Sequence, residues 1–251
     1  MLLHNKNAVI YGGGGAIGAA VARAFAREGA RVYLAGRTRQ TLEKAAESIR
    51  ADGGEVETEE VDALDEAAVD RFTDDVAARA GSVDIAFNLI SYGEVFGTPL
   101  VDMPLADFER PVHNAVRSMF LTSRAAARHM VKQRSGVILA FGGYGDPPHE
   151  YRLGGFQVAF GAMESLRRNL AAELGPYGVR VLTIQTAGVP ESLPEGVAGA
   201  KAIVESIEEL TMLGRAASLA DVGNVAAFAA SDMARSMTAT ALNITCGTVV
   251  D

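Results

Sequence analysis

The chain has few of the residues that form disulfides or bind metal ions. It contains one cysteine, Cys246, and no tryptophan among 251 residues. A single cysteine excludes an internal disulfide and any metal site built from several thiolates. The histidines and carboxylates also lack the spacing of metal ligands, so we predict that no metal is bound.

Long apolar runs and an excess of positive charge are also missing. No hydrophobic stretch approaches the roughly 18 residues that span a bilayer, and residues 1–6 lack the pattern of a signal peptide. The formal net charge is −8, which repels a phosphate backbone and an anionic lipid surface. We therefore predict a cytoplasmic protein that binds neither nucleic acid nor membrane.

The composition predicts a globular protein with one large core. Hydrophobic residues make up 49% of the chain and charged residues 22%, as expected for a chain of this length that buries its apolar surface. No proline-rich linker, internal repeat or change in composition divides the sequence. We predict a single domain over residues 1–251.

Short apolar runs alternate with longer amphipathic segments. Runs rich in β-branched and aromatic residues, bounded by Gly, Asp or Asn, predict strands at 7–11, 31–35, 55–60, 85–88, 137–141, 179–185 and 241–244. Helical periodicity predicts helices at 17–28, 39–51, 66–80, 105–133, 153–174 and 220–230. This alternation is typical of the α/β class: a doubly wound, seven-stranded parallel sheet with helices on both faces, known as a Rossmann domain.

Long loops follow several of the predicted strands. They are residues 92–105, 142–155 and 186–214, the last with a short helical pattern at 197–210. Because they follow strands, they are expected at the carboxyl edge of the sheet, where open α/β folds bind ligands. Loops of this length in a compact domain are usually functional. We predict that they line a substrate site.

A glycine-rich segment lies between the first predicted strand and the first predicted helix. It reads Tyr-Gly-Gly-Gly-Gly-Ala-Ile-Gly over residues 11–18. Glycines allow the backbone to approach a pyrophosphate closely, and the following helix offers unpaired N–H groups to it. The cofactor contacts predicted here are Gly12, Gly14, Gly15, Ala16, Ile17 and Gly18.

The end of the second predicted strand indicates which dinucleotide binds. An NAD site needs an acidic residue there to accept hydrogen bonds from the ribose 2′-hydroxyl. This chain has Gly36, followed by Arg37 and Thr38. A guanidinium suits a 2′-phosphate in both charge and geometry. We predict NADP(H), bound by Arg37 and Thr38.

These motifs resemble the short-chain dehydrogenase/reductase family. Its Thr-Gly-x-x-x-Gly-x-Gly pattern maps onto Tyr11, Gly12, Ala16 and Gly18, and the chain departs from it at Tyr11 and Ala16. Residues 212–215, 220–222, 229–232 and 242–244 also resemble the family's C-terminal third. The resemblance therefore extends over essentially the whole chain.

The resemblance implies further cofactor contacts. Asp62, followed by Ala63, stands where the family has an aspartate that bonds the adenine ring. Asn88 and Leu89 begin the segment that matches the family's Asn-Asn-Ala-Gly, of which Asn88 alone is retained. The resemblance also implies a small-molecule substrate and a homodimer or homotetramer.

The family's usual catalytic residues are missing. In the family a tyrosine acts as general acid or base, a lysine lowers its pKa, and a serine polarises the substrate carbonyl. Alignment places Phe156 at the tyrosine position, Phe160 at the lysine position and Gly143 at the serine position. The family's assisting asparagine falls on Ala115, with Asn114 beside it.

A shift of register does not restore these residues. No lysine occurs between Lys132 and Lys201, and no serine or threonine occurs between Ser135 and Ser165. The resemblance therefore identifies a divergent member of the family.

Three functions remain open. The first is hydride transfer between NADP(H) and a small carbonyl or alcohol, with a relocated acid among Tyr144, His149 and Tyr151. Histidine as a residue type can donate a proton near neutral pH, and His149 stands beside Glu150. The second is a cofactor-binding pseudoenzyme, including a silent partner of an active relative. The third is isomerisation, dehydration or cyclisation on the same scaffold without redox chemistry.

Overall fold

The computed structural model of the protein describes residues 1–143, 152–193, 196 and 199–250. The strands are β1 (Asn7–Tyr11), β2 (Arg31–Gly36), β3 (Val56–Glu60), β4 (Ile85–Asn88), β5 (Gly136–Gly143), β6 (Val179–Thr186) and β7 (Thr240–Asn243). The α-helices are α1 (Ala16–Arg27), α2 (Arg39–Ala51), α3 (Glu66–Ala80), α4 (Leu105–Gln133), α5 (Gly155–Leu174), α6 (Ala200–Glu209) and α7 (Leu219–Ala230). Short 3-10 helices are η1 (Leu100–Asp102), η2 (Gly175–Tyr177), η3 (Pro190–Ser192) and η4 (Asp232–Ala234).

The strands form one seven-stranded parallel sheet in the order β3-β2-β1-β4-β5-β6-β7. The strand order reverses at β1, which pairs with both β2 and β4. At such a switch point the loops after neighbouring strands diverge and leave a crevice at the carboxyl edge. The predicted doubly wound Rossmann fold is confirmed.

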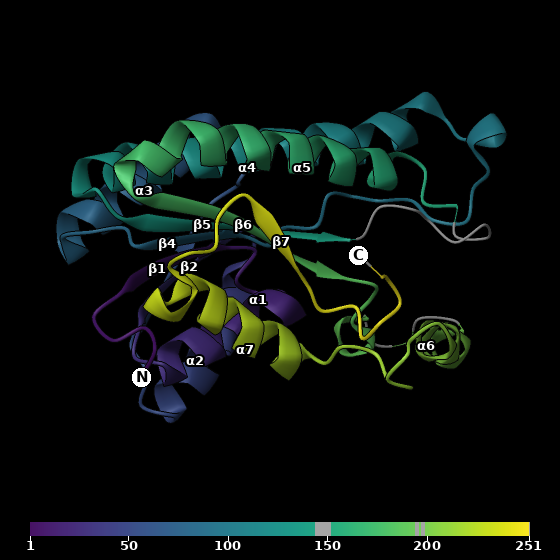
Figure 1. The fold of residues 1–251 in the computed structure, drawn as a ribbon, viewed down its shortest axis with the longest axis horizontal. Coiled ribbons are helices and arrows are strands. Elements are labelled where there is room, and N and C mark those ends of the chain that lie inside the picture. The colour runs from purple at the N-terminus through teal and green to yellow at the C-terminus, as the bar shows by residue number, and fades with distance from the viewer. Residues whose placement is uncertain (144–151, 194–195, 197–198, 251) are drawn as a thin grey trace.

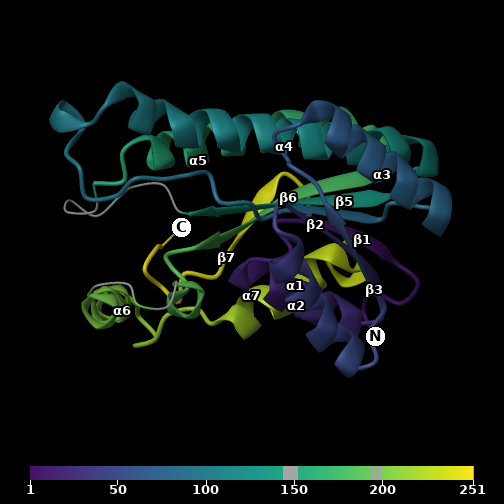
Figure 2. The same cartoon turned by 180° about the vertical axis from the view of Figure 1, so that it is seen from behind.

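Helices cover both faces of the sheet. Figures 1 and 2 show α1, α2 and α7 on one face and α3, α4 and α5 on the other. Phe25 and Leu42 are buried in the core of the first face, whereas Phe72 and Met130 are buried in the core of the second. Helix α6 stands apart from both layers, beyond the carboxyl edge of the sheet (Figure 1).

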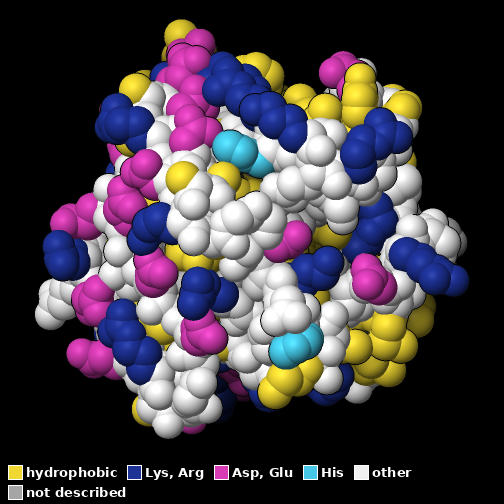
Figure 3. Space-filling model, turned by 90° about the vertical axis from the view of Figure 1, so that its left-hand side faces the viewer, with side chains coloured by type: hydrophobic (Ala, Val, Ile, Leu, Met, Phe, Trp, Pro, Cys, Tyr) yellow, Lys and Arg dark blue, Asp and Glu magenta, His cyan; other side chains and the backbone are white. Residues whose placement is uncertain are grey.

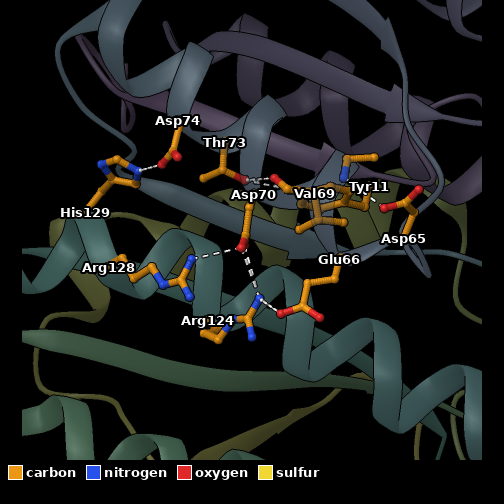
Figure 4. A network of polar contacts seen from close by, with 11 residues as sticks. Tyr11, Asp65, Glu66, Val69, Asp70, Thr73, Asp74, Arg124, Arg128 and His129 are labelled. Atoms are coloured by element: carbon orange, nitrogen blue, oxygen red, sulfur yellow. Dashed lines mark hydrogen bonds and ion pairs between the residues drawn. The ribbon is translucent and has the colours of Figure 1, made fainter.

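Charged side chains fasten α3 to α4, as Figure 4 shows. Arg124 Nη2 lies 2.8 Å from Glu66 Oε1 and 3.1 Å from Asp70 Oδ2, and Arg128 Nη1 lies 2.9 Å from the same Asp70 oxygen. Single exposed ion pairs contribute at most about 1 kcal/mol. Because these pairs share Asp70 and Arg124, they form a network that sets the position of α3 on α4.

Local signals explain where most elements begin and end. Helix α7 begins at Leu219 because Ser218 and Asp221 form a reciprocal capping box. Strands β5 and β6 run further than predicted, to Gly143 and Thr186, because their last residues pair with each other. The sequence predicts a loop at Gly142 and Gly143. In the structure both residues extend β5, because they pair with Gln185 and Thr186 of β6.

The surface at the amino edge of the sheet carries charges of both signs. Figure 3 views the molecule from the left-hand side of Figure 1, where the strands begin, and shows basic and acidic side chains interspersed. A large patch of one sign does not form on this face. In the part of the chain that the structure describes, no helix is long and apolar enough to cross a membrane.

Helices α4 and α5 approach each other closely at Gly155. A Cβ atom on Gly155 would lie 1.9 Å from the carbonyl oxygen of Phe108, whereas one on Gly161, further along α5, would meet nothing within 4 Å. We expect Gly155→Ala to lower the free energy of unfolding by about 1–3 kcal/mol, because α4 and α5 must separate.

Gly161→Ala is the matched control within the same helix. It should raise stability by up to about 1 kcal/mol, because alanine favours the helix over glycine. Urea unfolding followed by circular dichroism measures both changes. Equal effects of the two substitutions would show that the α4–α5 contact is not tight at Gly155.

Candidate functional site

The turn from β1 into α1 is built on close backbone contacts. Gly12 has φ of 77°, and a Cβ atom there would lie 2.4 Å from the carbonyl oxygen of Leu89. A Cβ atom on Gly18 would lie 2.2 Å from the Gly12 carbonyl oxygen. Side chains at these two positions are therefore excluded by space, and at Gly12 also by the positive φ.

The first turn of α1 is open to an anion. Its N-cap, Gly15, has no side chain that could bond the free N–H groups, and the first turn contains no acidic residue. Unpaired N–H groups and the positive end of the helix dipole favour a negative charge at this position. The glycine cradle, which a Cβ atom would fill, and the uncapped helix start fit the pyrophosphate of a dinucleotide.

A cavity of about 460 Å³ opens beside this turn. It is lined by Tyr11, Gly12, Gly14, Gly15, Ala35, Gly36, Arg37, Thr41, Val61, Asp62, Ala63, Leu64, Leu89, Ile90, Ser91, Gly93, Arg110 and Asn114. These residues come from the carboxyl ends of β1 and β2, from the glycine turn, from the segments after β2, β3 and β4, and from α2 and α4. Segments far apart in the sequence therefore meet at the switch point of the sheet.

Most of the predicted cofactor contacts are in this lining, but some are not. Ala16, Ile17, Gly18, Thr38 and Asn88 are absent from it. Ala16, Ile17 and Gly18 lie in the first turn of α1. Thr38 is the N-cap of α2, directly after Arg37.

Asn88 is buried beneath the cavity rather than facing it. Its Nδ2 donates to Ser118 Oγ at 2.9 Å, and its Oδ1 accepts the N–H of Ile90 at 3.3 Å. The side chain therefore holds the turn through Leu89 and Ile90 against α4. This geometry makes Asn88 a positioning residue for the cavity wall.

Arg37 and Asp62 both line the cavity with polar groups available. Within the described residues, the guanidinium of Arg37 has no hydrogen bond or ion pair, and the residue is exposed. Asp62 Oδ1 accepts the N–H of Leu64 at 2.9 Å. This bond shapes the turn after β3 and leaves the second carboxylate oxygen toward solvent.

Tyr11, which departs from the family's glycine pattern, points its side chain away from the cavity. Its hydroxyl forms a 2.8 Å hydrogen bond with Thr73 Oγ1 on α3, and its ring packs edge-on against Phe72. Burial raises the pKa of the Tyr11 hydroxyl above its ordinary value. The phenol is thus a neutral part of the core, and only the main chain of Tyr11 belongs to the cofactor turn.

Sequence reasoning did not predict the contribution of α4. Asn114 Nδ2 donates to the carbonyl oxygen of Tyr92 at 3.0 Å, and Arg110 Nη1 donates to that of Gly93 at 3.4 Å. Arg110 also pairs with Asp107 at 2.6 Å. Residues spaced as Arg110 and Asn114 share one helix face, and Asn114 also stands beside Ala115, the position of the family's assisting asparagine.

The residues aligned with the family's catalytic positions lie together. Phe160 packs on Gly143, where a Cβ atom would lie 2.4 Å from Phe160 Cε2. The rings of Phe156 and Phe160 are 4.3 Å apart between centroids, and Phe156 also contacts Phe96 at 5.4 Å and Tyr92 at 6.2 Å. This aromatic cluster (Tyr92, Phe96, Phe156 and Phe160) joins the loop after β4 to the start of α5, and its Phe160 contacts the end of β5.

The predicted acids Tyr144, His149 and Tyr151 lie outside the described residues. Among the residues that are described, Tyr92 is the phenol in the aromatic cluster. Burial, and to a smaller extent the charge of Glu94, raises the pKa of Tyr92 above its ordinary value. Its hydroxyl therefore stays protonated at neutral pH.

Neither a metal centre nor a second ligand site emerges from the described residues. They contain no group of three or more His, Cys, Asp or Glu side chains placed to hold a metal ion. A smaller cavity of about 290 Å³ lies at the amino edge of the sheet. Arg180 in its wall donates to the carbonyl oxygens of Ala229 and Ser231, so this arginine ties η4 and α7 to β6.

The fold and the cavity define a Rossmann domain of the nicotinamide-dependent oxidoreductase class. A family model described as enoyl-(acyl carrier protein) reductase matches residues 14–248. The chain belongs to the short-chain dehydrogenase/reductase family.

Known relatives match nearly the whole chain. The uncharacterized oxidoreductase YxbG of Bacillus subtilis (strain 168) is 30% identical over 236 residues, covering 92% of this chain and 86% of the relative. The 3alpha-hydroxysteroid dehydrogenase of Mediterraneibacter gnavus is 30% identical over 254 residues, covering 97% of each. The structure of NAD+-bound xylitol dehydrogenase matches with a TM-score of 0.88 at 26% identity, covering 98% of this chain and 100% of that chain.

The contact between Gly143 and Phe160 yields a prediction. Gly143→Ala should lower the free energy of unfolding by about 1–3 kcal/mol, because the new methyl group overlaps the Phe160 ring. In a Phe160→Ala background the same change should cost well under about 1 kcal/mol, which makes the two effects non-additive. A double-mutant cycle by urea unfolding measures the coupling. The same cost in both backgrounds would rule out the contact.

Proposed function

We propose that the protein is an NADP(H)-dependent oxidoreductase with a non-standard active site that acts on a small carbonyl or alcohol. The observation that carries this proposal is one cavity that contains both the glycine turn and an unpaired Arg37. Gly36, at the end of β2, offers no carboxylate to a ribose 2′-hydroxyl. A 2′-phosphate would find the Arg37 guanidinium there with its donors free.

Each part of the cavity has a role in this proposal. The N–H groups of Ala16, Ile17 and Gly18 in the first turn of α1 receive the pyrophosphate. The free oxygen of Asp62 accepts from the adenine amino group, and Ala63 and Leu89 form apolar walls near the ring. Asn88 and Asn114 act indirectly, because they hold the turn at 89–93 in place.

When bound, the dinucleotide supplies the hydride, and the protein orients the substrate and provides a proton. The wall formed by Gly143, Phe156 and Phe160 has no proton-donating side chain. The donor must therefore come from another segment, and we retain Tyr144, His149 and Tyr151 as its candidates. Orientation by itself supplies a large part of such catalysis.

The aromatic cluster also favours a second candidate function, a silent NADP(H)-binding protein. Phe160 fills the space beside Gly143 that a serine side chain would occupy. In that case the chain binds the dinucleotide without turnover and works beside an active relative. A homodimer or homotetramer in the cytoplasm remains our proposal for the catalytic form.

Arg37 tests the choice of cofactor. We expect Arg37→Ala to weaken NADPH binding by roughly tenfold or more, because charge-assisted hydrogen bonds contribute about 1.5–3 kcal/mol each. NADH binding should hardly change. Titration followed by nicotinamide fluorescence measures both affinities. Both coenzymes are tested because one solved relative is bound to NAD+.

Arg23→Ala is the matched control, because Arg23 is also exposed, lies on α1, and does not line the cavity. It should leave both affinities unchanged. Tighter binding of NADH than of NADPH by the unaltered protein would rule out the assignment of NADP(H). Binding of neither coenzyme would exclude the redox function.

Turnover separates the two candidate functions. We expect NADPH oxidation, followed by absorbance at the nicotinamide band, with at least one member of a panel of carbonyl compounds. Replacing the proton donor among Tyr144→Phe, His149→Ala and Tyr151→Phe should slow this reaction by about 100-fold or more. Firm NADPH binding without turnover would instead support the silent protein.

A further inference from the structure

We propose that the substrate is an apolar compound with a flat ring system, bound against Phe96 and Phe156 beside the cofactor cavity. This inference rests on the proposed function and names the substrate class of the same site. It separates two chemistries found among the relatives, because one of them is a steroid dehydrogenase and another acts on galactitol by name.

The wall for such a ring is already assembled from aromatic side chains. Phe156 is its centre, since its ring contacts Phe160, Phe96 and Tyr92. Phe96 meets Phe156 edge to face, at 74° between the ring planes. Aromatic rings prefer offset and edge-to-face contacts, so a ring of a ligand can pack against these side chains in the same geometries.

The outer side of this wall is left uncovered. Phe96 is 54% exposed, and the next large apolar residues along the chain, Leu100, Val101 and Leu105, are 66%, 91% and 69% exposed. Neighbouring apolar groups that remain in water usually mark a binding surface. Removing these side chains from water contributes a free energy of roughly 25 cal/mol per Å² of apolar area buried. An apolar ligand is therefore favoured over a polar one at this surface.

The loop that carries Phe96 is attached to the start of α5. The N–H of Gly97 donates to the carbonyl oxygen of Arg152 at 3.1 Å. This bond holds Phe96 next to Phe156, although the two residues are far apart in the sequence. The wall is therefore formed before any ligand arrives, which lowers the entropic cost of binding.

The wall offers almost no charge to a polar substrate. Residues 92–101 and 153–163 contain one charged residue, Glu94. Arg152 precedes the second range, and its Nη1 donates to the carbonyl oxygen of Gly97 at 3.5 Å. The Glu94 carboxylate accepts from Tyr92 N–H at 3.1 Å and from Ser91 Oγ at 3.3 Å, so its own loop satisfies it. Recognition of a polyol requires polar partners for each hydroxyl group, and a hydroxyl buried without one costs about 1–3 kcal/mol.

The wall adjoins the place where the cofactor is proposed to bind. Tyr92, one of its members, lies between Ser91 and Gly93, which both line the cavity. Beyond the carboxyl edge of the sheet, Figures 1 and 2 show α6 on the side of α1 and α7, whereas the segment before α4 lies on the side of α4 and α5. Leu210, Met212 and Leu213, just after α6, are also exposed.

The test measures binding rather than turnover. The ketone 2-tetralone, which has two fused rings, and the polar ketose D-xylulose are titrated into the full-length protein by calorimetry, with and without NADP+. NADP+ cannot reduce either ketone, and the titration without NADP+ excludes oxidation of the D-xylulose hydroxyl groups, so its heats report binding. We expect 2-tetralone to bind at least tenfold more tightly than D-xylulose. Phe96→Ala should weaken 2-tetralone binding by about five- to tenfold, because one ring contact is lost.

Met233→Ala is the matched control: Met233 is 69% exposed but lies on η4, at the opposite edge of the sheet, and should change nothing. Tighter binding of D-xylulose, or unchanged 2-tetralone binding in Phe96→Ala, would overturn the proposed substrate class. Binding of 2-tetralone as expected, but without oxidation of NADPH when this is supplied, would support the ring site and exclude hydride transfer. Reduction of D-xylulose but not of 2-tetralone would support hydride transfer and overturn the ring site.

Discussion

The site depends on one close contact, in which the backbone of Gly12 packs against the backbone of Leu89. Strand β1 must turn into α1 directly beneath the carbonyl of Leu89, and Gly18 must then pass beneath the carbonyl of Gly12. No side chain fits at either place. Because the turn is this tight, the start of α1, with its free N–H groups, lies beside the cavity at the switch point of the sheet.

The two halves of the site are built on different principles. The half that we propose for the cofactor contains backbone N–H groups, one free guanidinium and one carboxylate, which suit a charged dinucleotide. The other half uses the rings around Phe156, whose contacts are apolar. Gly143 lies where the two halves meet. Because glycine has no side chain, the Phe160 ring packs on the end of β5, where the family resemblance implies a serine hydroxyl group.

The elements of the fold were predictable because their signals are local. Strand and helix periodicities, the glycine turn and the Gly36-Arg37 pair can each be read within a short window of sequence. Orientation could not be read in that way. Asn88 carries the family's motif, yet its amide is bonded to Ser118 on α4 and faces away from the cavity. Arg110 lines the cavity without any motif that marks it, and Asn114 lines it one residue before the position of the family's assisting asparagine.

The sequence by itself therefore determined the class of fold, the order of its strands and helices along the chain, and the absence of any lysine between Lys132 and Lys201. These properties follow from residue types at fixed local spacing. The tertiary structure decided which side chains meet: Phe96 against Phe156, Phe160 on Gly143, and α4 in the cavity wall. Such contacts join segments distant in the chain, and they depend on how closely whole helices and strands pack.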